Sequence, residues 1–349
     1  MKRSLIRGSV NGASGYVPGE QPQGSRMVKL NTNENPYPPS PAIGKALAGF
    51  PADSLRLYPD PACRELRAAI ARLHGCAPEN VICGNGSDDL LTLCFSAFLE
   101  NDGAVGFLDP SYSLYPAMAS LRGLRTVPVE LGARFESRLP PEGAPCQLFF
   151  LTNPNAPTGY LCPKDEVEAF CRRQRGVVVI DEAYVDFSAA DCMDLALGLD
   201  NAICLRTLSK SYSLAGLRLG YAVGPVPLVN ALFKVKESYN VDRITQALAL
   251  AAISDSAAMR SGVEKVKATR SRFSRVLSDM GFDVYPSESN FIWARPGARQ
   301  AKDVYRELAR RQIYVRYFEG PRTGDCIRIS IGTDADMDLL AAALREMKA

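Results

Sequence analysis

The chain has 349 residues, of which 46% are apolar and 23% charged, and its formal net charge is +3 at pH 7. This length exceeds what one hydrophobic core usually supports, so we expect two domains in a soluble globular protein. The small net charge argues against a nucleic-acid groove. The sequence contains no run of about eighteen apolar residues, so we expect no membrane span.

The histidine and cysteine content narrows the possible chemistry. The ten cysteines show no C-x-x-C pair and no metal-ligand spacing, so we expect a reduced, cytoplasmic protein without a metal site. His74 is the only histidine, and we expect it at the end of a helix, interacting with the helix dipole. Catalytic triads built on histidine therefore lack a base, and the chemistry must come from Lys, Asp, Tyr, Arg or a cofactor.

The first two hundred and forty residues or so alternate short apolar runs with helical patterns, after an arm (1–40) rich in Gly, Pro, Asn and Ser. Helices are expected at Asp88–Leu99 and Lys164–Arg173. The predicted strands are Val81–Cys83, Ala104–Leu108, Gln147–Thr152, Val177–Asp181, Ala202–Arg206 and Leu219–Val223. This alternation predicts a mostly parallel sheet covered by helices.

The pattern changes after residue 240. A long helical stretch, roughly Thr245–Met280, is followed by two short strands, Phe291–Ala294 and Cys326–Ile331, with a helix between them. We interpret this part as a smaller α+β domain. The expected division is thus an arm (1–40), a large domain (41–240) and a small domain (241–349).

A lysine segment, LRTLSKSYSLAGLRLGYAVG at 205–224, has features of an anion site. Ser209 and Ser211 flank Lys210, and Arg218 follows in a turn bracketed by glycines. Most lysines are simply exposed, but that interpretation does not explain hydroxyls and a guanidinium gathered in an apolar stretch. A phosphate group would explain both, because these side chains supply hydrogen-bond donors and positive charge.

Upstream, VVVIDEAYVDF places Asp181 at the end of a buried strand, where open α/β sheets bind ligands. Such an aspartate often caps the following helix instead. The lysine segment favours another role for Asp181, because a pyridine nitrogen stays protonated next to a carboxylate. Tyr184 could then donate to the ring oxygen at the other end of the same ring.

Ten segments spread over nearly the whole chain resemble the pyridoxal-phosphate enzymes that share the aspartate aminotransferase fold, in particular the histidinol-phosphate aminotransferases. They are GYVPG (15–19), LNTNENPYPPSP (30–41), RLYPDP (56–61), GNGSDD (84–89), DPSYSLYP (109–116), NPNAPTG (153–159), DEAYVDF (181–187), TLSKSYSLAGLRLGY (207–221), VRYF (315–318) and IRISIGT (327–333). The resemblance implies an α/β large domain with a mostly parallel seven-stranded sheet sandwiched by helices, and a smaller α+β C-terminal domain. It also implies an arm that packs with the small domain and a dimer partner.

The resemblance implies roles around pyridoxal 5'-phosphate. Lys210 would bind the cofactor aldehyde and then move the substrate proton, Asp181 would pair with the ring nitrogen, and Tyr184 would donate to the ring oxygen. The other implied cofactor contacts are Gly86, Ser87, Asp88, Tyr112, Thr207, Ser209 and Arg218. Without the resemblance, GNGSDD would be an ordinary helix N-cap and Tyr112 a core residue.

Three further roles carry over with alternatives. The asparagine that usually precedes P-T-G is Ala156 here, so either Asn155 takes its role or Tyr184 serves the ring oxygen alone. Tyr58 would reach the neighbouring site of a homodimer, and is otherwise a turn aromatic. On the substrate side, Arg328 would bind a carboxylate, and Arg316 and Tyr16 a distal phosphate; an exposed ion-paired arginine is the alternative for Arg328.

The expected function is therefore that of a transaminase for a phosphorylated amine and glutamate or 2-oxoglutarate: histidinol phosphate and 2-oxoglutarate would be interconverted with imidazole-acetol phosphate and glutamate, in histidine biosynthesis. Aromatic amino-acid aminotransferase and threonine-phosphate decarboxylase are the enzyme alternatives. A regulatory module that binds pyridoxal phosphate without turnover is the alternative outside enzymes, but the chain has no DNA-binding appendage.

Overall fold

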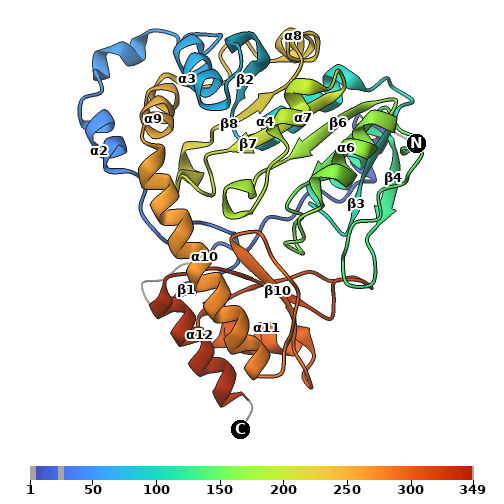
Figure 1. Cartoon of the computed structure of the whole chain (residues 1–349), viewed down its shortest axis with the longest axis vertical. Coiled ribbons are helices and arrows are strands. Elements are labelled where there is room, and N and C mark those ends of the chain that lie inside the picture. The colour runs from blue at the N-terminus through green and yellow to red at the C-terminus, as the bar shows by residue number, and fades with distance from the viewer. Residues whose placement is uncertain (1–4, 23–26, 348–349) are drawn as a thin grey trace.

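The computed structural model describes residues 5–22 and 27–347, so parts of the expected arm (1–4 and 23–26) and the last two residues lie outside the described residues. A larger unit contains a seven-stranded sheet, and a smaller unit contains a four-stranded sheet. Helix α10 (Ser256–Asp279) runs from the first unit into the second (Figure 1). In the described ranges, none of the helices is long and apolar enough to cross a membrane.

The large sheet has the strand order β2-β8-β7-β6-β5-β3-β4, and only β8 runs antiparallel to its neighbours. Its strands are β2 (Val81–Gly84), β8 (Gly220–Val223), β7 (Ala202–Thr207), β6 (Val177–Asp181), β5 (Leu148–Thr152), β3 (Ala104–Asp109) and β4 (Arg125–Glu130). The expectation of a mostly parallel seven-stranded sheet is confirmed. Edge strand β4 was not expected, because it has no apolar run and contains Pro128, which edge strands tolerate.

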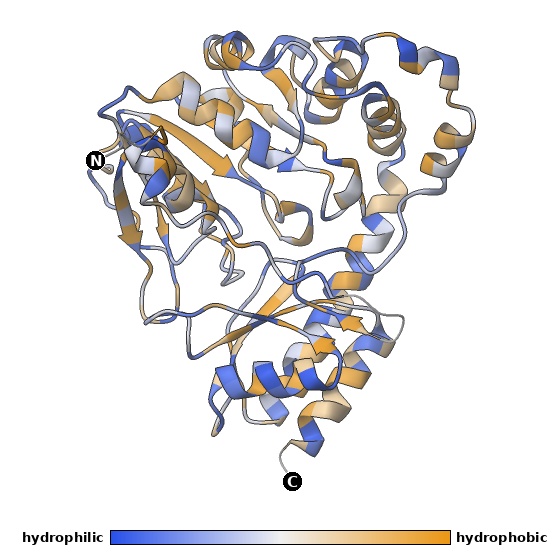
Figure 2. Cartoon of the chain, turned by 180° about the vertical axis from the view of Figure 1, so that it is seen from behind, coloured by the Kyte–Doolittle hydropathy of each residue, from blue (hydrophilic) through white to orange (hydrophobic). Residues whose placement is uncertain are grey.

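Both faces of this sheet are covered, which explains why its central strands are almost continuously apolar (Figure 2). In β5, Phe149 and Leu151 pack into one hydrophobic cluster while Leu148 and Phe150 pack into another on the opposite face. Helices α2 (Pro41–Ala48), α3 (Arg64–His74), α6 (Lys164–Arg173), α7 (Met193–Gly198) and α9 (Arg243–Ser254) contribute to the clusters on one face. Helices α4 (Ser87–Phe98), α5 (Leu114–Arg122) and α8 (Val226–Val235) cover the other.

The smaller unit is an antiparallel sheet with helices packed against it. The strand order is β12 (Arg316–Tyr317), β13 (Ile327–Ser330), β10 (Phe291–Arg295) and β9 (Asp283–Val284). Helices α10, α11 (Ala301–Arg310) and α12 (Asp334–Glu346) share one hydrophobic cluster with this sheet. The arm adds β1 (Val28–Lys29), which pairs in parallel with β11 (Ile313–Tyr314).

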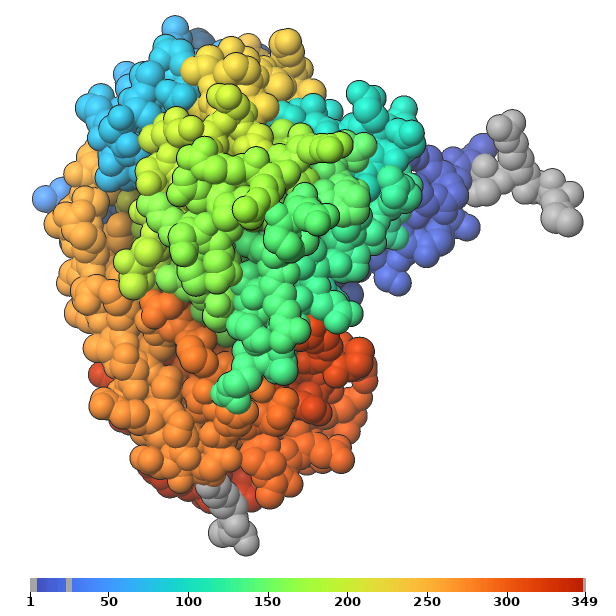
Figure 3. Space-filling view, turned by 45° about the vertical axis from the view of Figure 1, so that its right-hand side comes forward, coloured from blue at the N-terminus to red at the C-terminus, as the bar shows by residue number. Residues whose placement is uncertain are grey.

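The remaining elements are short. Helix α1 (Gly8–Asn11) packs near α5, and this blue N-terminal segment projects from the side of the molecule (Figure 3). Four 3-10 turns complete the described chain: η1 (Ala52–Arg56), η2 (Pro78–Asn80), η3 (Val185–Phe187) and η4 (Ala215–Leu217).

The single long helix expected at Thr245–Met280 is two helices, because Asp255 between α9 and α10 leaves the helical conformation (φ −116°, ψ 57°). Its carboxylate accepts a hydrogen bond from Ser40, the N-cap residue of α2. Helix α9 packs on α2 and α3, so it lies with the large unit. The division at residue 240 stays a prediction, and we propose that the boundary lies at Asp255 instead.

Candidate active site

The candidate site is a cavity of about 240 Å³ where the carboxyl ends of β5, β6 and β7 face the first turn of α4, the arm and the strands β12 and β13. The expected residues that line it are Tyr16, Ser87, Asp88, Tyr112, Asp181, Tyr184, Thr207, Ser209, Lys210, Arg218, Arg316 and Arg328. The fold therefore gathers side chains that lie as far apart in sequence as the arm and the small unit.

Lys210 lies in the loop after β7, and its Nζ donates to the carbonyl of Thr32 at 3.2 Å. The loop is held by Asn35, whose amide donates to the carbonyls of Lys210 and Ser211. Burial of the amine and, next, the charge of Arg328 lower the pKa of Lys210 to about 8. An amine that loses its proton this readily suits a nucleophile or a base.

Asp181 is the last residue of β6 and is buried. Its carboxylate accepts hydrogen bonds from the Tyr115 hydroxyl at 2.6 Å and the Ala183 amide at 3.2 Å. Burial raises the pKa of Asp181 to about 6, against the opposing effect of these bonds. A cation placed beside this carboxylate would be stabilised and would lower the same pKa.

The other end of the pocket is suited to a phosphate. Thr207, Ser209 and Ser87 face the cavity together with Arg218, whose Nη2 lies 3.3 Å from Asp88 Oδ2. Helix α4 begins at Ser87, so its free amides and dipole favour an anion there.

Close packing of backbone and guanidinium shapes this end of the pocket. Gly86 has φ +81°, and a Cβ there would lie 2.5 Å from Arg218 Nη2. Arg218 itself adopts a left-handed conformation with φ 55°. A side chain at position 86 would therefore displace the guanidinium from the phosphate end.

Two arginines from the small unit reach the opposite end without a carboxylate partner among the described residues. Arg328 donates to the carbonyl of Asn31 at 3.0 Å, and its Nε is buried without a hydrogen-bond partner in the described chain. Burial lowers the pKa of Arg328. Arg316 donates to the arm carbonyls of Val17 and Pro18. Uncompensated guanidinium groups in a pocket favour anionic ligands.

Comparison with known proteins identifies the family. A family model described as aminotransferase class I and II matches residues 25–344. A histidinol-phosphate aminotransferase of Rippkaea orientalis is 42% identical over 98% of this chain and 98% of its own length. Histidinol-phosphate aminotransferase 2 of Thiobacillus denitrificans is 46% identical over 95% of this chain and 94% of its own. This chain belongs to the class I and II aminotransferase family.

A solved structure agrees with this assignment. The crystal structure of histidinol-phosphate aminotransferase from Sinorhizobium meliloti in complex with pyridoxal-5'-phosphate has a TM-score of 0.82 and 27% identity, with 91% of each chain covered. The protein is thus a transaminase that uses pyridoxal 5'-phosphate, and the non-enzyme alternative is set aside. The residues present fit the cofactor, since the pocket offers a phosphate cradle, a buried carboxylate and an amine of lowered pKa.

Three expected residues do not line the aminotransferase pocket. Gly86 lies behind it, against Arg218. Asn155 turns away, because its amide donates to Pro110 and Thr158, and the pocket wall at this position is Ala156. The geometry therefore gives no support to Asn155 as a replacement donor.

The third residue outside the pocket is Tyr58. It is 75% exposed and stacks on Tyr239 with ring centroids 4.3 Å apart. Because Tyr58 does not line the pocket of its own chain, a role for it at an active site would require the site of a second subunit.

Sequence reasoning missed two side chains that orient the others. Tyr115 bonds to both Asp181 and Thr152, and Asn33 bonds to Tyr184 at 3.0 Å. Both lie in segments that carried the resemblance, DPSYSLYP and LNTNENPYPPSP. The sequence of this motif does not show that Tyr112 faces the pocket whereas Tyr115 bonds to the carboxylate of Asp181.

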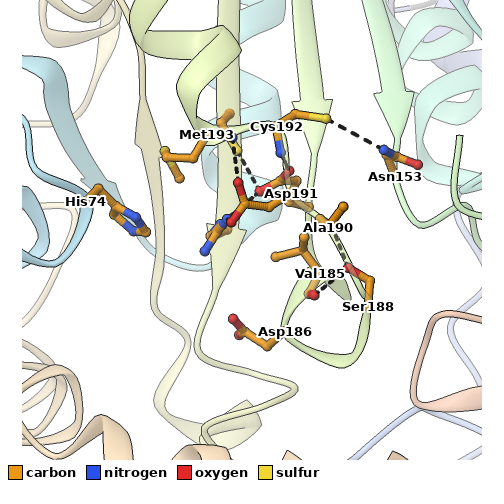
Figure 4. A network of polar contacts seen from close by, with 12 residues as sticks. His74, Asn153, Val185, Asp186, Ser188, Ala190, Asp191, Cys192 and Met193 are labelled. Carbon is orange, nitrogen blue, oxygen red and sulfur yellow. Dashed lines mark hydrogen bonds and ion pairs between the residues drawn. The ribbon is translucent and has the colours of Figure 1, made fainter. Parts of the chain in front are cut away.

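A polar network, buried except at Asp191, links the strand ends behind the pocket (Figure 4). Arg206 forms ion pairs with Glu182 at 2.8 Å and with Asp191 at 3.1 Å. The amide of Cys192 donates to Glu182, and its sulfur lies 3.8 Å from the Asn153 amide. Because these residues follow or belong to β5, β6 and β7, the network holds together the strands that present Asp181 and Lys210.

His74 borders this network and ends α3, as expected. Its Nε2 lies 2.9 Å from the hydroxyl of Tyr221. Burial lowers the pKa of His74 to about 4, so the ring is neutral near pH 7. His74 is half-buried in the last turn of α3, and its interaction with the helix dipole stays a prediction, for an uncharged ring.

Proposed function

We propose that this aminotransferase interconverts histidinol phosphate and 2-oxoglutarate with imidazole-acetol phosphate and glutamate, as a cytoplasmic homodimer. The observation that carries the proposal is the pair of guanidinium groups, Arg316 and Arg328, that face the pocket without carboxylate partners in the described chain. The names of the full-length relatives support the same substrate.

In this proposal each residue has a defined task. When bound, the cofactor supplies an aldehyde and an electron-withdrawing ring. Lys210 would hold the cofactor through its aldehyde and would move the substrate proton, Asp181 would keep the ring nitrogen protonated, and Tyr184 would donate to the ring oxygen. Contacts at the phosphate and ring face fall to Ser87, Asp88, Tyr112, Thr207, Ser209 and Arg218, while Gly86 leaves room for the Arg218 guanidinium.

The substrate side is divided between two arginines. Arg328 binds the α-carboxylate of glutamate and 2-oxoglutarate, which histidinol phosphate lacks. Arg316, with Tyr16, binds the distal group, which is a phosphate in one half-reaction and a carboxylate in the other. The ring of Tyr16 packs edge-on against that of Tyr112 at 5.8 Å, so it lies beside the proposed cofactor face.

The deciding experiment offers the purified enzyme histidinol phosphate, phenylalanine and threonine phosphate in turn. The loss of visible absorbance in a single turnover ranks the amines, and we expect histidinol phosphate to react fastest. Efficient turnover of phenylalanine without histidinol phosphate would replace the proposal by an aromatic aminotransferase. Release of carbon dioxide from threonine phosphate would replace it by a decarboxylase.

The lowered pKa of Lys210 predicts how cofactor attachment depends on pH. Only the neutral amine attacks an aldehyde, and burial brings the pKa of this amine to about 8. The rate of attachment to cofactor-free protein should therefore rise through about pH 8, rather than above pH 10 as for a free lysine. Mixing protein and cofactor across this range, with N-acetyl-lysine as the control amine, measures it; the same profile for both would contradict the prediction.

A subunit-mixing experiment tests the role of Tyr58. Lys210→Ala and Tyr58→Ala proteins are each expected to be inactive or strongly impaired. In a mixed dimer, one site has the intact Lys210 and receives the intact Tyr58 of the other chain, so random exchange should restore about a quarter of the parent activity. No recovery despite exchange, shown by differently tagged subunits, would exclude a role for Tyr58 across the dimer.

A further inference from the structure

The segment 31–33 crosses the pocket between β1 and α2 and contacts three side chains of the proposed site in turn. The first carbonyl of the segment accepts a hydrogen bond from Arg328 at 3.0 Å, and the second accepts one from Lys210 at 3.2 Å. The side chain of the third residue, Asn33, donates to the hydroxyl oxygen of Tyr184 at 3.0 Å. Only this last contact depends on the side chain of the segment rather than on its backbone.

Asn33 is held so firmly that its amide has one possible direction. It is 1% exposed and adopts a left-handed conformation with φ 56°, which asparagine tolerates better than most residues. The side-chain oxygen of Asn33 accepts a hydrogen bond from Ser330 Oγ at 2.8 Å. The backbone amide of Asn33 donates to Ser330 Oγ at 2.9 Å. Asn290 donates to its carbonyl at 2.9 Å. The amide nitrogen is thereby left to point at Tyr184.

The contact determines what Tyr184 can do with its own hydrogen. Asn33 occupies the hydroxyl oxygen as a donor, and the described residues offer no acceptor for the phenol hydrogen, which is free to be donated into the pocket. A hydroxyl that accepts one hydrogen bond becomes a stronger donor in the next. Burial raises the pKa of Tyr184, while the charge of Arg328 and the bond from Asn33 act in the opposite direction.

The residues of the pocket wall leave the Tyr184 hydroxyl without a second donor beside it for the ring oxygen. Position 156, where the resemblance expects a second donor to the ring oxygen, is an alanine, and the Asn155 amide is bonded elsewhere. Tyr184 is then the remaining side chain proposed for the ring oxygen. A change in its orientation has no neighbouring donor to compensate it.

We propose that Asn33 is a positioning residue for the reaction: its amide fixes the hydroxyl of Tyr184 so that the phenol hydrogen is directed to the ring oxygen of the cofactor. This inference rests on the proposed role of Tyr184. Asn33 itself touches neither cofactor nor substrate in this scheme.

The test is a pH titration of the visible absorbance of the cofactor-loaded protein. A hydrogen bond to the ring oxygen favours the more negative, deprotonated form of the bound chromophore, so losing it should raise the midpoint by about one pH unit. Asn33→Gly removes the amide without adding charge, and glycine tolerates φ 56°. Asn33→Asp keeps the acceptor for Ser330 but removes the donor, and it should raise the midpoint as well.

Matched controls separate this effect from loosening of the segment. Asn31→Gly truncates a neighbouring buried asparagine, whose amide bonds to the Glu20 carbonyl instead, and should shift the midpoint by less than about 0.3 pH unit. In a Tyr184→Phe background, Asn33→Gly should add no further shift, because the two residues act in one chain of hydrogen bonds. Thermal unfolding without cofactor shows that each variant is folded.

The outcomes are distinguishable. An equal shift in Asn31→Gly and Asn33→Gly, or full additivity with Tyr184→Phe, overturns the proposal and leaves a structural role for Asn33. An unshifted midpoint in both Asn33 variants, with a raised one in Tyr184→Phe, overturns it while the role of Tyr184 stands. An unshifted midpoint in Tyr184→Phe removes the proposed role of Tyr184 and this inference together.

Discussion

Lys210→Ala should abolish transamination, with a loss of kcat on the order of 10⁴-fold or more, because the proposed mechanism assigns both the covalent attachment and the proton transfer to this one residue. The protein should still bind pyridoxal phosphate through the phosphate end around Arg218, which lies on another part of the pocket. Single-turnover kinetics with substrate amine, and equilibrium dialysis of the cofactor, measure the two properties separately.

The matched control is Lys302→Ala, which removes an exposed lysine paired with Glu319 on the surface of the small unit. Its turnover should equal that of the parent. If Lys210→Ala retains full turnover, the proposed mechanism fails, whatever the substrate is.

Arg328→Ala should slow the glutamate half-reaction much more than the histidinol-phosphate half-reaction. Glutamate and 2-oxoglutarate carry an α-carboxylate for this guanidinium, and histidinol phosphate does not. Removing one partner of a buried charged contact costs about 2–4 kcal/mol, so kcat/KM for glutamate should fall roughly 30- to 1000-fold. The histidinol-phosphate half-reaction should change far less.

Two further variants sharpen this result. Arg328→Lys keeps the charge but loses the planar fork, and should recover only part of the lost rate. Arg316→Ala should damage both half-reactions, because both substrates present an anionic distal group to it. Equal losses in both half-reactions for Arg328→Ala would contradict the division of labour between these arginines.

The buried parts of the fold were predictable from the sequence because burial on both faces leaves a continuous apolar run. Strand β6, VVVID, and helix α6 were found at the positions they occupy. Strand β4 was missed because an edge strand needs no such run. The break at Asp255 was missed because the local pattern stays helical there, and the contact of Asp255 with Ser40, more than two hundred positions away, is not visible in the sequence.

For the candidate site, the sequence indicated which residues bear chemistry but not how they are held. The sequence alone shows Lys210 between two serines and Asp181 at the end of a predicted strand. The lowered pKa of Lys210 is not, because it arises from burial and from Arg328, which the small unit supplies. The direction of the Asn155 side chain likewise depends on a carbonyl of Pro110 that sequence spacing does not reveal.

The pairing of β1 with β11 has a consequence for synthesis of the protein. Val28 is synthesised well before its pairing partner Ile313, because the chain is made from its N-terminus. The segment that contacts Lys210 and Tyr184 follows β1 directly, so it cannot take its final place until the small unit exists. Contacts this distant in sequence form late in folding. The large unit can therefore collapse first, and the pocket is completed only when the small unit has been made and β1 has paired with β11.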